Sequence, residues 1–198
     1  MRRTHKLVIA AIGAVLALTS CTSTETTTPP RTPTPSPTAA PGGTPAPVKP
    51  ALIDPAAVDA TAPEKVAEAV AMASVTWDTT LHSSEYAAIG AVTALLTPEL
   101  AAMYAPVSQD GNPATDATWA QARDVGAYNV PDVRTAQANH SRPADTATTL
   151  YRVYDATWTW HGPGGITIND PRTRYLYLTI SQQPDGRWLV STFDTADV

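Results

Sequence analysis

Histidines and carboxylates are the side chains of this chain that could act as general acids or bases. The candidates are His82, His140, His161, Glu85 and Asp155. A catalytic base of this kind needs a pKa near the working pH, and the surrounding protein must supply that shift. We expect His82 to lie exposed at the end of a helix and His140 to lie in a loop. His161 precedes a Gly-Pro-Gly-Gly turn, which requires a flexible backbone and no chemistry.

Asp155 is the acid that the sequence places in the middle of a strand. By alternation it faces away from Trp158 and Trp160. If its face lined a cavity, burial would raise its pKa and Asp155 could act as a base. The alternative, which we expect, is a carboxylate that is solvated or paired with a neighbouring strand.

Motifs of the major catalytic classes are absent from the sequence. It has no nucleophile elbow, no P-loop and no dinucleotide fingerprint, and its four histidines lack metal-ligand spacing. We therefore expect no catalytic residue, no metal site and no cofactor.

Aromatic side chains are the remaining candidates for a site. They could line an apolar pocket or form a protein-binding patch, or they could be the core between sheet and helices. Since the chain has a single Phe, we expect tryptophan and tyrosine to fill most of the core. The candidate pocket or partner-binding residues are Trp77, Tyr154, Asp155, Trp158, Trp160 and Trp188.

The N-terminus has the pattern of a secretory signal peptide. Arg2, Arg3 and Lys6 precede a short apolar run, residues 7–19. That run is too short to span a bilayer comfortably. Cleavage of the signal peptide would remove these three basic residues and lower the formal charge from −5 to −8. An acidic exported protein is poorly suited to nucleic acid or anionic lipid headgroups, so we expect no nucleic-acid partner.

Cys21 is the only thiol, which excludes a disulfide within the chain. Leu18, Thr19 and Ser20 precede it, and this tetrapeptide resembles the lipobox of bacterial lipoproteins. The resemblance implies cleavage after residues 1–20, thioether lipidation of Cys21, palmitate or a related acyl chain, and a place on the outer face of the cell membrane. Two acyl chains give stable anchoring where one binds marginally. A plain signal peptide cleaved elsewhere is the alternative.

A tether follows the predicted lipid anchor. Residues 21–50 are rich in Thr and Pro and have almost no apolar side chain to bury, which predicts disorder. Thr-Pro and Ala-Pro steps favour extended conformers, which could reach about 90 Å at ~3.1 Å per residue. Residues 51–198 are long enough for one globular domain.

Helices are predicted in the first half of that domain. Thr61 and Glu64 form a capping-box pattern around Pro63. An apolar stripe then predicts a helix of about five turns, with Val66, Val70, Ala73, Trp77 and Leu81 on one side. Further helices are expected over residues 84–96, from Pro98 through Tyr104, and over residues 116–124.

Strands are predicted in the second half, where the period changes to two. They cover residues 130–139, 147–160, 174–182 and 187–193, with a turn at Pro184-Asp185-Gly186. Leu150, Arg152, Tyr154, Ala156, Trp158 and Trp160 share one face of the second strand, and Leu176, Leu178 and Ile180 share one face of the third. The order predicts an α+β fold with helices on one face of a curved four-stranded antiparallel sheet.

Three segments carry a family resemblance. They are Thr76-Trp77-Asp78, residues 94–101 (ALLTPELA) and residues 185–190 (DGRWLV). Over residues 60–195 the pattern resembles the nuclear transport factor 2-like superfamily, which implies a cone-shaped, cystatin-like fold. The Leu-Leu-Thr-Pro stretch with the lipobox resembles exported actinobacterial proteins of conjugation loci, whose domains are related to an inner-membrane assembly component of type IV secretion systems. Those components carry a transmembrane helix, where this chain has a predicted lipid anchor.

Two functions are consistent with these patterns. The first is a non-enzymatic lipoprotein whose domain binds envelope proteins, as an accessory of a conjugation or secretion apparatus, or as protection against a toxin or phage. The second is a small-molecule-binding or catalytic cone of isomerase or cyclase type. An enclosed pocket with a polar base would favour the second, and a filled interior with an exposed apolar groove would favour the first.

Overall fold

The computed structural model describes residues 47–104, 117–136, 141–169 and 171–198. The predicted signal peptide, lipobox, Cys21, most of the tether and His140 lie outside these residues. Within the described ranges, no helix is both long enough and apolar enough to cross a bilayer.

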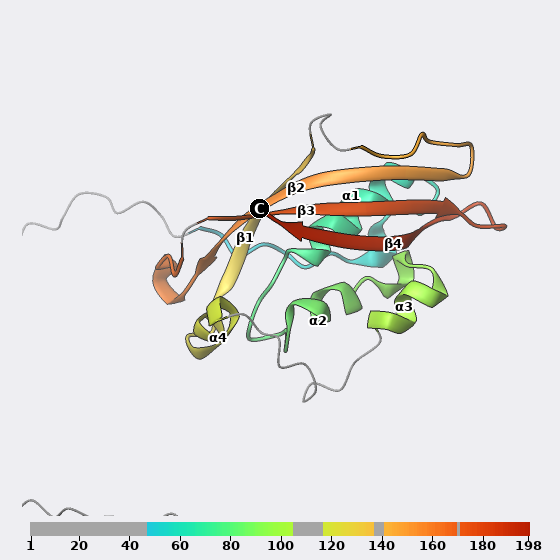
Figure 1. The fold of residues 1–198 in the computed structure, drawn as a ribbon. Coiled ribbons are helices and arrows are strands. Elements are labelled where there is room, and N and C mark those ends of the chain that lie inside the picture. Colours follow the sequence, from blue (N-terminus) through green and yellow to red (C-terminus); the bar gives the residue numbers. More distant parts are fainter. Residues whose placement is uncertain (1–46, 105–116, 137–140, 170) are drawn as a thin grey trace, which may run out of the picture. The chain divides into compact units, whose positions relative to one another are not determined.

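A four-stranded antiparallel sheet forms the second half of the domain, as predicted. It contains β1 (Tyr128–Thr135), β2 (Thr149–His161), β3 (Arg172–Gln182) and β4 (Trp188–Asp197). The strands lie in chain order, and the sheet is not closed (Figure 1). β4 continues past the predicted end, pairing with β3 as far as Asp197.

The turns and the edge of the sheet follow from local chemistry. Gly186 closes the turn between β3 and β4 with a φ of 86°, a conformation that glycine adopts without steric cost. Pro131 lies in β1, which is an edge strand, so its missing N–H breaks no interior ladder. Both positions agree with the prediction.

The helices are α1 (Pro63–Ser74), α2 (Glu85–Gly90), α3 (Pro98–Tyr104) and α4 (Ala117–Asp124). The last two match the predicted elements. The helix predicted over residues 84–96 is instead divided into α2 and a short 3-10 turn, Thr93–Leu95.

The prediction of a first helix of five turns was wrong, because α1 ends at Ser74. The backbone of Val75 and Trp77, just beyond that end, is bound instead by the side chain of Asn129 on β1. The Asn129 Oδ1 accepts the Trp77 N–H at 2.6 Å, and its Nδ2 donates to the carbonyl of Val75. The Asn129 N–H also donates to the Trp77 carbonyl at 3.0 Å. Leu81, at the end of the predicted stripe, is 61% exposed.

The predicted capping box was also wrong. The N-cap of α1 is Ala62, with no side-chain cap. Thr61 instead bonds Asp59, with its N–H at 2.9 Å and its hydroxyl at 2.7 Å. Glu64 turns away from the helix start to the guanidinium of Arg152 on β2.

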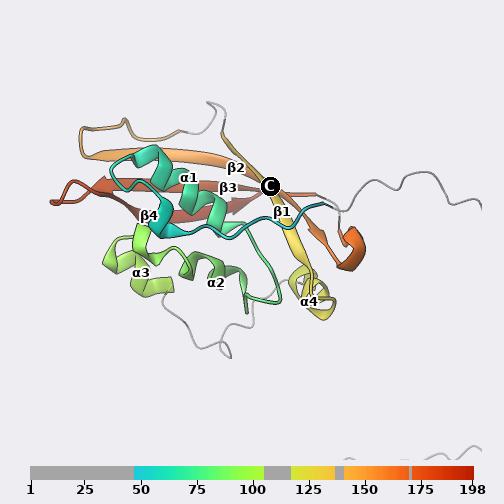
Figure 2. The ribbon, with the colours of Figure 1, turned by 180° about the vertical axis from the view of Figure 1, so that it is seen from behind.

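The core lies between the helices and one face of the sheet. Figures 1 and 2 show α1 running across that face. Fully buried members of this core are Val66 and Val70 of α1, Leu176 and Ile180 of β3, and Val190 of β4. The inward positions on β2 and β3 are those that alternation predicted.

Candidate functional site

Four buried indole rings gather where β2, α4 and the segment after α1 meet. We call Trp77, Trp119, Trp158 and Trp160 the indole cluster. Their exposed fractions are between 1% and 3%. Trp77 lies edge-on to Trp158, with ring centroids 5.1 Å apart, and is stacked with Trp160 at 5.8 Å. Trp119 meets Trp160 edge-on at 5.4 Å.

Each ring of the indole cluster is positioned by a different local feature. Trp158 and Trp160 share a face of β2 by alternation. Trp77 is oriented by the hydrogen bonds of its backbone to Asn129. Trp119 lies on the buried side of α4 together with Ala122. Trp119 was missing from the predicted site, although the sequence predicted its helix, because a helix this short does not show which side faces the core.

The cation of Arg174 packs against the indole cluster. Its guanidinium carbon lies 5.3 Å from the ring centroid of Trp158 and 6.0 Å from that of Trp77, within cation–π range. Arg174 Nη1 donates to Glu85 Oε2 at 3.0 Å, and Nε donates to Asp197 Oδ1 at 2.5 Å. Burial acts to lower the pKa of Arg174, but the hydrogen bond to Asp197 and the charge of Glu85 outweigh it, so the pKa is raised.

The indole N–H of Trp77 has no partner in the described part of the chain. Trp77 Nε1 is buried and has no hydrogen-bond acceptor among the described residues. An unmade hydrogen bond of this kind costs about 1–3 kcal/mol. Its N–H could serve a polar group of a ligand.

The other predicted site residues lie apart from the cluster or on the other face. Tyr154 is 3% exposed on the inner face of β2. Its burial raises the pKa of its hydroxyl, and the charges of Glu64 and Glu68 add to this. Trp188 begins β4, where its N–H donates to the Ala60 carbonyl at 2.7 Å.

Asp155 lies on the outer face of the sheet, as alternation predicted. Its partners in register are Arg134 on β1 and Tyr175 on β3. The structure thus brings together Trp77, Trp158 and Trp160 from the predicted set.

His82 is buried, so the prediction that it would be exposed was wrong. Its exposed fraction is 8%, and its Nδ1 accepts the Asp78 N–H at 3.1 Å. It lines a pocket of about 10 Å³, which is about the room that one water needs. Burial lowers the pKa of His82, with the positive charge of Lys49 adding to it and the negative charge of Asp78 opposing it.

Asp78 is a buried carboxylate beside His82. Its side chain is 3% exposed, and its Oδ2 contacts the ammonium of Lys49. Its Oδ1 accepts the N–H of Thr80 at 2.9 Å and the Thr80 hydroxyl at 2.7 Å. Burial acts to raise the pKa of Asp78, but the hydrogen bonds from Lys49 and Thr80 outweigh it and the pKa is lowered.

His161 is 9% exposed and ends β2. Its ring centroid lies 6.0 Å from that of Tyr128. The glycine-rich segment after it forms the predicted turn, in which the Gly162 N–H donates to the Ile166 carbonyl at 2.7 Å. Across the described ranges, no three His, Cys, Asp or Glu side chains are grouped so that they could hold a metal ion.

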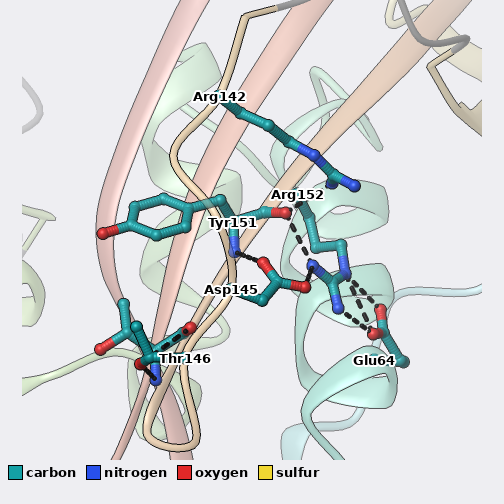
Figure 3. Close-up of polar contacts among 7 residues, drawn as sticks. Glu64, Arg142, Asp145, Thr146, Tyr151 and Arg152 are labelled. Atoms are coloured by element: carbon teal, nitrogen blue, oxygen red, sulfur yellow. Dashed lines mark hydrogen bonds and ion pairs between the residues drawn. The ribbon is translucent and has the colours of Figure 1, made fainter.

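Arg152 joins the start of α1 to β2 and to the segment before β2 (Figure 3). Its Nε donates to Glu64 Oε2 at 2.8 Å, and its Nη1 donates to Asp145 Oδ2 at 2.8 Å. Arg142 Nη1 and Arg152 Nη1 both donate to the Tyr151 carbonyl at 2.7 Å. The pKa of Glu64 is lowered by the Arg152 guanidinium. This arrangement holds the helix against the sheet.

Three rings form an aromatic row on the helix side of β4. Tyr86 of α2 is stacked with Tyr104 of α3 at 6.3 Å, and Tyr104 meets Phe193 of β4 edge-on at 6.4 Å. Tyr86 is 54% exposed, and Met103, next to Tyr104 in the chain, is 70% exposed. The sequence showed no sign of this row, because its members come from three elements whose packing it could not predict.

Comparisons with known proteins found no match to this chain. No family model, no curated protein and no solved structure matches this chain.

Proposed function

We propose that this chain is a lipoprotein held by an acylated Cys21 on the outer face of the cell membrane. The observation that carries the proposal is the sequence of residues 1–21, in which a basic stretch, a short apolar run and two small residues precede the only cysteine. The following residues, rich in Thr and Pro, hold the domain away from the membrane surface.

The domain binds other envelope proteins and has no enzymatic activity of its own. Two features support this role. The indole rings occupy the interior next to β2, with exposed fractions of 3% or less. Exposed aromatic and apolar side chains, Tyr86 and Met103, lie on α2 and α3, and such residues are enriched at protein interfaces.

We assign the fold to the cone-shaped nuclear transport factor 2-like type, with the sheet curved around its helices. On the same resemblance, the partners belong to a conjugation or secretion apparatus. The order of elements supports this assignment: the helices precede an antiparallel sheet of four strands in chain order.

Replacing Cys21 by Ala tests the anchor. We expect the wild-type chain in the membrane fraction and Cys21→Ala in the soluble exported fraction. Ser20→Ala, which keeps a small residue before the cysteine, is the matched control and should stay with the membrane. If Cys21→Ala remains in the membrane fraction after a carbonate wash, the lipoprotein assignment is wrong.

A second candidate function is a small-molecule site at the indole cluster. The buried, unpartnered Nε1 of Trp77 favours it. Native mass spectrometry of protein purified from its own host would show a bound molecule as added mass. We expect such a mass to be lost in Trp77→Phe, which keeps an aromatic ring and removes the N–H. Protein of the unmodified mass throughout would exclude this candidate.

A further inference from the structure

The last residues of the predicted tether contact the domain. The Tyr128 hydroxyl donates to the Pro47 carbonyl at 2.5 Å. Lys49 reaches the carboxylate of Asp78. Leu52 and Ile53 then line the pocket over His82. We call residues 47–53 the strap, since they run along the domain before α1 begins.

We propose that the strap is a pH-sensitive attachment, docked through Lys49 and Asp78 while His82 is neutral and released when His82 takes up a proton. Release lengthens the free tether by the strap's own residues. This inference does not depend on the proposed lipid anchor or on the nature of the partner.

The docked strap supplies the cation, Lys49, that pairs with the buried carboxylate of Asp78. Asp78 has a side chain that is 3% exposed, and a buried carboxylate without a cation is strongly unfavourable. Thr80 contributes two neutral donors. Among the described residues, Lys49 is the cation paired with this carboxylate. Docking of the strap and burial of the charge are therefore coupled.

The neutral form of His82 fits the docked state. Its Nδ1 accepts the Asp78 N–H, so it carries no proton there. The strap covers it with Leu52 and Ile53, while α1 and α2 contribute Ala73 and Ala88 to the same pocket. A charged imidazole would lie under apolar side chains and lose the hydrogen bond.

The charged groups around His82 give the direction of the effect. Asp78 and Lys49 are the ones that act on it, and the other pocket residues are apolar or, for Thr76, neutral. A proton on His82 would offer Asp78 a second cation and repel Lys49. Both changes weaken the ion pair that holds the strap.

The direction in which pH changes docking of the strap follows from proton linkage. Docking lowers the pKa of His82, and release returns it towards its ordinary value of 6.5. The released state therefore binds protons more readily. Docking is at full strength above pH 6.5 and is lost as the pH falls below it, by up to about tenfold per pH unit until the docked form also protonates. The released strap adds roughly 20 Å of reach at ~3.1 Å per residue.

A spin label on the strap tests this inference. Val48 is 86% exposed, and Val48→Cys in the full chain with Cys21→Ala provides a single thiol. We expect a restrained nitroxide at pH 8 and a mobile one at pH 5, with the mobile-to-restrained ratio rising at least about tenfold. Ile166→Cys, on a 69% exposed residue of the turn after β2, is the control and should show no change.

Two substitutions separate strap release from general acid effects. His82→Gln removes the titrating group and should leave the label restrained at pH 5. Lys49→Met should leave it mobile at both pH values. An unchanged label in the wild-type chain between pH 8 and pH 5 would overturn the inference, as would the same pH response in His82→Gln.

The wild-type fold offers a second measurement should His82→Gln fail to fold. The imidazole of His82 can be titrated by NMR in wild type and in Lys49→Met. We expect its pKa to rise in Lys49→Met, because this variant removes a repelling charge and the free strap exposes the ring. Equal pKa values in the two proteins would overturn the inference.

Discussion

The Asn129 side chain forms two hydrogen bonds to the backbone that follows α1. Its removal should be among the most costly substitutions in the domain. Its exposed fraction is 0%. Its amide accepts the Trp77 N–H and donates to the Val75 carbonyl. Asn129→Ala leaves both backbone groups buried without partners, at about 1–3 kcal/mol each. We expect a loss of about 2–6 kcal/mol in the free energy of unfolding.

Urea unfolding followed by tryptophan fluorescence measures this loss. The indole cluster reports directly, because Trp77 is one of its rings. Thr135→Ala, at an exposed position of the same strand, is the control and should stay within about 0.5 kcal/mol of wild type. A loss below 1 kcal/mol for Asn129→Ala would show that the end of α1 is determined by something other than this amide.

Two further predictions concern charged side chains. Arg174→Met should lower the free energy of unfolding by about 1–3 kcal/mol, measured in urea, because it leaves Glu85 and Asp197 unpaired and removes a cation from two indole rings. Arg187→Met, in an exposed pair, is the control and should change it by no more than about 0.5 kcal/mol. Equal losses in the two variants would contradict the reasoning. The hydrogen bonds of Arg152 and the Tyr151 N–H lower the pKa values of Glu64 and Asp145, so their contribution to stability is full above the ordinary values of 4.5 and 3.8 and is lost as the pH falls below them towards the lowered values. Arg152→Gln should therefore weaken the dependence of the urea midpoint on pH between pH 6 and pH 3, whereas Arg134→Gln should keep the wild-type dependence. A wild-type dependence in Arg152→Gln would contradict this account.

The sheet could be predicted from the sequence because its signals are local. Alternation on β2 and β3 identified the inward side chains, and Pro184-Asp185-Gly186 marked the turn between β3 and β4. The same alternation puts Arg174 on the inner face with Leu176, which the structure confirms. A charged residue at an inward position was the available signal for this part of the site.

The features that the sequence did not show depend on contacts between distant residues. The apolar spacing of Trp77 and Leu81 continued the pattern of α1, but Asn129, 52 residues away from Trp77, ends the helix earlier. His82 is buried by strap residues that the sequence placed at the boundary of the tether. Periodicity within one element carries no information about either contact.

Site-specific photocrosslinking in cells tests the central proposal most directly. A photoreactive residue replaces Tyr86, in the aromatic row, or Ile166, an exposed apolar residue in the turn after β2, in a tagged chain at native expression. We predict that Tyr86 yields a discrete crosslinked envelope protein, identified by mass spectrometry, and that Ile166 does not. Equal yields from both positions, or no adduct from Tyr86 while a known envelope complex crosslinks in the same cells, would contradict the partner-binding role.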